Sequence, residues 1–155
     1  MSESFGQLEA LRIRKAQENE AKKVEWQITK RELIRSQAPL FFDKVGEILS
    51  QSASDFNDAL ELTGDSAMSF RQHDHVIEIG KSGGHTAIIR KIVYHAADGV
   101  VKVRTQIIKG LQDQSRDEAL VFDVNSDGQI ILGGVDFATF TQRMFKTIAD
   151  AYGPA

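Results

Sequence analysis

The feature that most constrains this chain is its N-terminal third, where residues 4–37 contain no proline and a single glycine, Gly6. Residues 12–23 are mostly strong helix formers, and Glu18 and Lys22 have the i, i+4 spacing of a helical ion pair. The pattern therefore predicts a long helix.

The predicted helix is too polar to be buried. Within residues 12–23 only Ile13 and two alanines are apolar, so this part projects into solvent or lies along another chain. An apolar patch at its far end indicates self-association, with a homodimer as one outcome, or binding of a protein partner. The apolar residues that return at Val24, Trp26 and Ile28 can serve the same role, or they mark the point where the helix begins to dock onto the body. A frayed terminus without function is the alternative. The candidate partner-binding residues are Phe5, Leu8, Leu11 and Trp26.

A second helix is predicted after the first. Pro39 suits a first helical turn, apolar residues recur at helical spacing over residues 41–59, and Gly64 can end the helix. We therefore expect two N-terminal helices, a charged one within residues 1–36 that can serve as an association arm and a second one over residues 39–61.

From residue 67 onward the pattern changes to strands separated by turn sequences such as Asp98-Gly99. Consecutive hairpins imply an antiparallel meander. The predicted strands are 68–80, 86–95, 100–108, 120–124 and 129–132, with 110–118 as a polar loop or helical turn.

A last helix is predicted from Phe137, with Asp136 as N-cap, to Tyr152. Its apolar stripe suits one face of the sheet. The predicted fold class is α+β, in which two N-terminal helices and a C-terminal helix accompany a five-stranded antiparallel meander. Residues 37–155 form the single predicted domain.

Tight turns would set the register of the sheet, with Ile79 opposite Thr86 and His95 opposite Lys102. Alternation then separates a core face from a wet face. The predicted core face holds Ile77, Ile79, Ile88, Ile92, Tyr94, Val101, Val103 and Ile107.

Charge is unevenly distributed along the chain, whose net charge is −3. Residues 66–109 carry seven Lys or Arg against three Asp or Glu, whereas residues 37–65 carry one against six. This pattern indicates either charge complementarity within the fold or a basic sheet face that binds an anion or single-stranded nucleic acid. The candidate anion-binding residues are Lys91, His95, Lys102 and Arg104.

Residues 123–130 (DVNSDGQI) resemble the first eight positions of the EF-hand calcium loop. That resemblance implies oxygen ligands from Asp123, Asn125 and Asp127. Gly134 stands where the loop needs a bidentate glutamate, and the flanks read as strands, so the pattern favours a hairpin turn. No metal and no cofactor are predicted.

His73 and His75 are predicted on one face of one strand, roughly 7 Å apart. A pocket beside them would suit a small enzyme, although no nucleophile motif accompanies them. A small enzyme is therefore an alternative to a protein-interaction module and to a protein that binds an anion or single-stranded nucleic acid.

The remaining features exclude several classes of protein. Without cysteine there is no disulfide or thiolate site, and no apolar run is long enough to span a membrane. The first residues lack a secretory leader, so a cytoplasmic protein is the expectation. The preferred hypothesis is a small, non-catalytic protein-interaction or regulatory module.

Overall fold

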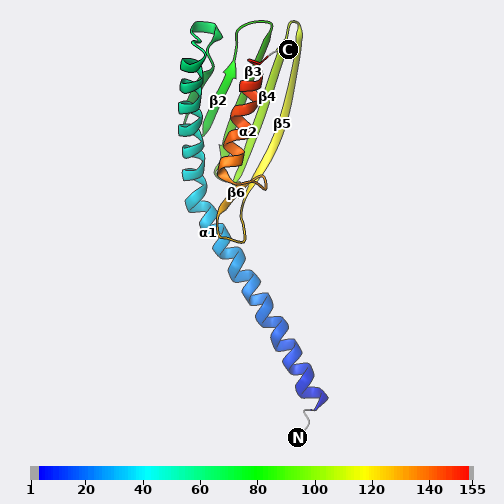
Figure 1. Ribbon diagram of the computed structural model, residues 1–155. Coiled ribbons are helices and arrows are strands. Elements are labelled where there is room, and N and C mark those ends of the chain that lie inside the picture. Colours follow the sequence, from blue (N-terminus) through cyan, green and yellow to red (C-terminus); the bar gives the residue numbers. More distant parts are fainter. Residues whose placement is uncertain (1–3, 154–155) are drawn as a thin grey trace.

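The computed structural model describes residues 4–153. It has the predicted α+β class, with a long N-terminal helix, an antiparallel sheet and a C-terminal helix (Figure 1). The elements are α1 (Phe5–Ala59), the 3₁₀ helix η1 (Gly64–Ser66), β1 (Ser69–His73), β2 (Val76–Lys81), β3 (Thr86–His95), β4 (Val100–Lys109), β5 (Gln112–Val124), β6 (Ile130–Leu132) and α2 (Phe137–Asp150).

The prediction of two N-terminal helices is wrong, because α1 runs without a break through Pro39. A proline inside a helix removes one hydrogen bond and costs about 3 kcal/mol. Here Ala38 before it and Phe41 and Phe42 after it are buried in the core, so tertiary packing holds the helix on both sides. The helix changes direction near this position (Figure 1), which is the usual consequence of an internal proline. The predicted division into residues 1–36 and 37–155 stays a prediction.

The sheet has six strands in sequence order, not the five predicted. The predicted first strand is two strands, β1 and β2, joined by a turn in which Asp74 has a φ of 51°. The predicted polar loop at 110–118 is largely the first part of β5, which pairs with β4 along ten positions. Its side chains are exposed on both faces, so it lacks the alternation that identifies a strand.

The register differs from the prediction, but the faces do not. Ile79 pairs with Arg90, not Thr86, and His95 pairs with Val100, not Lys102. Both shifts are even, so each side chain keeps its face. All eight predicted core-face residues are buried or packed against the core.

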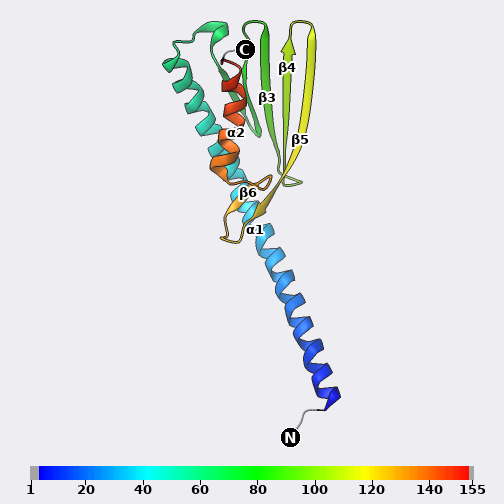
Figure 2. The ribbon, with the colours of Figure 1, turned by 45° about the vertical axis from the view of Figure 1, so that its right-hand side comes forward.

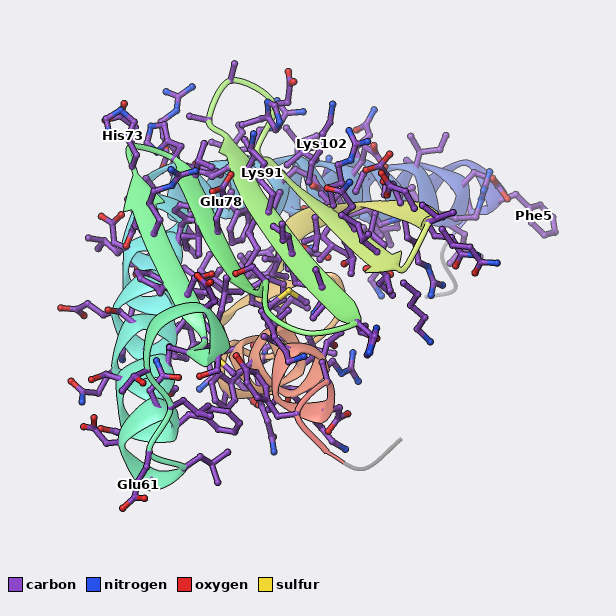
Figure 3. The ribbon with its side chains drawn as sticks, turned by 90° about the horizontal axis from the view of Figure 1, so that it is seen from above. Phe5, Glu61, His73, Glu78, Lys91 and Lys102 are labelled. Atoms are coloured by element: carbon purple, nitrogen blue, oxygen red, sulfur yellow. The ribbon has the colours of Figure 1, made fainter. Side chains whose placement is uncertain are left out.

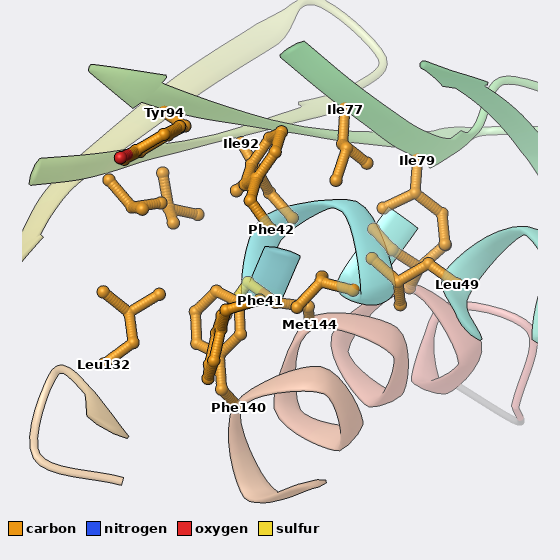
Figure 4. Close-up of a cluster of buried hydrophobic side chains, with 14 of the residues drawn as sticks. Phe41, Phe42, Leu49, Ile77, Ile79, Ile92, Tyr94, Leu132, Phe140 and Met144 are labelled. Carbon is orange, nitrogen blue, oxygen red and sulfur yellow. The ribbon is translucent and has the colours of Figure 1, made fainter. Parts of the chain in front are cut away.

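Both helices lie on the same face of the sheet, and the core is the layer of side chains between the helices and the sheet (Figure 4). Phe42 of α1 packs against Tyr94 of β3, with ring centroids 5.7 Å apart. Helix α2 begins where predicted, because Asp136 accepts a hydrogen bond from the Thr139 N–H (2.8 Å). The other face of the sheet, which carries Glu78, Lys91 and Lys102, is not covered by a helix (Figure 3).

Candidate functional site

The N-terminal half of α1 projects from the body of the protein (Figures 1 and 2). Every residue from Phe5 to Thr29 is exposed, and we call this segment the arm. Lys30 is the first partly buried residue, and its Nζ lies 3.2 Å from Oδ1 of Asp123 in β5. The arm is roughly 37 Å long at about 1.5 Å per residue.

The arm begins at a well-formed cap. Ser4 Oγ accepts a hydrogen bond from the Gln7 N–H (3.2 Å), and the Gln7 side chain accepts one from the Ser4 N–H (2.9 Å). This capping box satisfies two backbone donors that the first helical turn would otherwise leave free. The start of the arm is therefore fixed by its own sequence rather than by contact with the body.

The four predicted partner-binding residues all lie on the arm and are exposed, but they do not form one patch. Phe5, Leu8 and Leu11 are at the tip, and the Phe5 side chain is 89% exposed. Trp26 lies roughly 22 Å further along the axis at about 1.5 Å per residue. Its ring is 5.5 Å from Nζ of Lys30, near the body.

A second apolar surface on the arm was not recognised from the sequence. Six residues at spacings of three and four fall within about 80° of the helix circumference. Two of them are alanines and one is glutamine, which hides the stripe in a hydropathy pattern. We call this surface the Ala10–Ile28 stripe; its residues are Ala10, Ile13, Gln17, Ala21, Val24 and Ile28.

The uncovered sheet face brings the four predicted anion-binding residues together. Lys91, His95, Lys102 and Arg104 line one cavity of about 560 Å³, together with acidic side chains of β5. Arg104 Nε lies 3.9 Å from Oδ1 of Asp117, which offsets part of the positive charge. The anion-binding alternative stays a prediction.

Nucleic-acid binding on this face would lack stacking partners from the two aromatic residues nearest to it. Phe70 and Tyr94 both pack on the core side of the sheet. Sheet proteins that bind single strands usually stack bases on exposed aromatic rings.

The two histidines of the enzyme alternative do not share a strand, contrary to the prediction. His73 ends β1 and His75 lies in the turn that follows, because the chain reverses at Asp74. His73 lines a cavity of about 480 Å³. The His75 ring packs against the Tyr94 ring instead, with the ring centroids 5.4 Å apart. Among residues 4–153 no three His, Asp or Glu side chains gather as a metal site would require.

The calcium-like segment forms a hairpin between β5 and β6, as the turn interpretation predicts. Asn125 Oδ1 accepts hydrogen bonds from the N–H groups of Asp127 (3.0 Å) and Gln129 (2.9 Å). Asp123 Oδ1 accepts from the Val124 N–H (2.8 Å) and from Lys30. Two of the three candidate ligand side chains are thus engaged within the protein.

Asp123 links β5 to the base of the arm, and we expect that link to depend on pH. The pKa of Asp123 lies below its usual value, first because of the Val124 N–H and then because of Lys30. A lowered folded-state pKa stabilises the protein above the unfolded pKa of about 4, and this contribution is lost as the pH falls through the folded-state pKa.

The measurement is the free energy of unfolding in urea, for the natural chain and Asp123→Asn, between pH 7 and pH 3. We expect Asp123→Asn to be less stable at pH 7, and the difference to shrink below about pH 4. Asp127→Asn removes a charge from the same turn without touching Lys30 and serves as the control. A difference that is independent of pH would contradict the assignment.

Comparison with protein-family models, curated proteins and solved structures finds no match for this chain. Within the part of the chain that the structure describes, no helix combines the length and apolarity needed to cross a bilayer.

Proposed function

We propose that the protein is a non-catalytic protein-interaction module that associates through the arm. One observation supports the proposal: Phe5–Thr29 is helical and exposed throughout, yet it carries seven large apolar side chains on its surface. They are Phe5, Leu8, Leu11, Ile13, Val24, Trp26 and Ile28.

An isolated helix is only marginally stable in water, because most helical stability in proteins comes from packing. The arm has no such packing against its own body. Burial of its apolar side chains against another helix would supply about 25 cal/mol per Å² of apolar surface removed from water. Association therefore stabilises the conformation that the arm adopts.

The first experiment compares the molar mass of the full chain with that of a chain beginning at Val24, by light scattering after size exclusion. We expect the full chain to exceed its 17.2 kDa monomer mass and the shortened chain to be a monomer. The shortened chain keeps the whole body from Lys30 onward, so its fold can be checked independently by circular dichroism.

A matched control tests whether an exposed apolar residue outside the arm also contributes to association. Leu111, in the turn between β4 and β5, is fully exposed. That turn lies at the end of the molecule away from the arm (Figure 1). Leu111→Glu should leave the mass of the full chain unchanged, whereas the double variant Val24→Glu/Ile28→Glu should lower it. The same oligomeric state for all of these chains would contradict self-association through the arm.

A further inference from the structure

We propose that the partner of the arm is a second copy of this chain, which lies antiparallel to it and packs through the Ala10–Ile28 stripe. This inference rests on the proposed function and adds the identity of the partner, the contact surface and the direction of pairing. Three features of the arm support it: the spacing of the stripe, the sizes of its residues and the charges beside it.

The spacing of the stripe suits a straight partner helix. Its steps along the chain are three, four, four, three and four residues, so five steps cover eighteen residues. That is about 3.6 residues per step, the period of an undistorted α-helix, and the stripe therefore runs along the arm without drifting around it. A second straight helix can contact it over its whole length.

The sizes of the side chains favour the antiparallel direction. The alignment places Gln17 of each copy opposite Ala21 of the other, on either side of the two-fold axis. Ala10 then lies opposite Ile28 of the second copy, and Ile13 lies opposite Val24 of the second copy. Each alanine then faces a larger residue, which fills the contact. A parallel pair in register would instead place alanine opposite alanine twice and leave gaps.

Gln17 gives this arrangement a defined register. Each Gln17 amide lies near the two-fold axis, within reach of the same group on the second copy. A polar residue within an apolar helix contact specifies the register, because a shifted alignment leaves its amide without a partner. A parallel pair in register would also bring the two amides together, so the direction of pairing rests on the side-chain sizes and the charges.

The charges beside the stripe also favour the antiparallel pair. Arg14 and Glu25 lie on the same edge of the stripe, are exposed, and form no ion pair within the described residues. The antiparallel alignment puts Arg14 of each copy beside Glu25 of the other. A parallel alignment would put Glu20 beside Glu25 of the other copy, which is repulsive.

One contact of the antiparallel pair is unfavourable by itself. The two Glu20 side chains approach each other near the two-fold axis. Lys23 lies one turn further along the same helix, at the i, i+3 spacing at which it can compensate each of them.

The opposite side of the arm is less suitable for self-pairing. Leu8 and Trp26 lie there, but Lys15 and Lys22 occupy the surface between them. Two copies packed through that side would bring these ammonium groups together near the two-fold axis. We therefore assign the contact to the Ala10–Ile28 stripe.

The end of the second arm would reach the body. In the antiparallel alignment, Phe5 of the second copy lies at the level of Leu33. Arg31 and Arg35, which continue the stripe toward the body, are exposed. Arg31 also lines a cavity with Val121 and Asp123 of β5, so the tip of the second arm would lie beside that strand.

Engineered cysteines can test the direction of pairing, because the chain has no cysteine of its own. Residues 10 and 28 of one arm are roughly 27 Å apart at about 1.5 Å per residue, too far for a bond within one chain. We expect the full chain with Ala10→Cys and Ile28→Cys together to form a disulfide-linked dimer on mild oxidation, and neither single variant to do so.

Charge exchange can test the contact without a covalent bond. We expect Arg14→Glu to raise the dimer dissociation constant about tenfold, since two attractive pairs become repulsive. Arg14→Glu combined with Glu25→Arg should restore it. The two residues are too far apart within one helix to compensate each other, so rescue has to act between copies. Lys22→Glu, on the opposite side, is the control and should have no effect.

The outcomes separate this inference from the proposed function. Dimers that need the arm but crosslink through Ala10→Cys alone would overturn the antiparallel pairing and leave the proposed function standing. The same holds for arm-dependent dimers that neither crosslink nor respond to the charge exchange. A full chain that is monomeric at every concentration would overturn the inference. An oligomeric state that is the same with and without the arm would also remove self-association as the function of the arm.

Discussion

Replacing Phe42 with alanine is expected to lower the free energy of unfolding by about 3–5 kcal/mol. The Phe42 side chain is 2% exposed, and its ring packs against Tyr94 of β3 (Figure 4). Its removal leaves a cavity between α1 and the sheet, at the contact that attaches the long helix to the body. Urea unfolding, followed by circular dichroism, measures the change.

The matched control for this variant is Leu40→Ala, two residues earlier on the same helix. The Leu40 side chain is 62% exposed, so its replacement should change the free energy of unfolding by less than about 0.5 kcal/mol. Similar losses for the two variants would mean that α1 does not pack on the sheet as described.

Replacing Pro39 with alanine is expected to stabilise the protein by about 1–2 kcal/mol. Alanine restores the missing backbone donor and avoids the clash with the preceding turn, which together cost about 3 kcal/mol in a regular helix. The gain is reduced by about 0.4–1 kcal/mol because proline also restricts the unfolded chain. The bend at this position relieves a further part of the clash.

The measurement for Pro39→Ala is again the free energy of unfolding in urea, with Gln37→Ala, an exposed position in the same helix, as the control. Gln37→Ala should change the free energy by only a few tenths of a kcal/mol. If Pro39→Ala is destabilising, the bend is needed to fit α1 to the sheet, and helix propensity at this position is the smaller effect.

The α+β class and the faces of the sheet could be predicted from the sequence. Ile77, Ile92 and Val103 were assigned to the core correctly, although the predicted register was displaced. Side chains alternate with a period of two, so an error of two or four residues in register does not change the face. The start of α2 was also predictable, because the Asp136 cap acts on its own helical turn.

Part of the candidate site could be predicted as well. The polar stretch at residues 12–23 correctly indicated a helix without a place in the core. The sequence also pointed to the apolar tip at Phe5. The Ala10–Ile28 stripe was missed, because alanine and glutamine are not conspicuous as contact residues until the continuous helix places them in one row.

The sequence by itself determined what short-range interactions control: the helix cap at Ser4, the hairpin turn at Asn125 and the alternating faces of β3 and β4. The tertiary structure decided what depends on residues distant in the chain. Local propensity ends a helix at Pro39, but the burial of Ala38 and Phe42 carries α1 through it. Residues 112–119 lack the alternating pattern of a strand, and they form part of β5 because they pair with β4. Packing and pairing energies between distant segments outweigh local preferences of this size, and a pattern of neighbouring residues does not contain them.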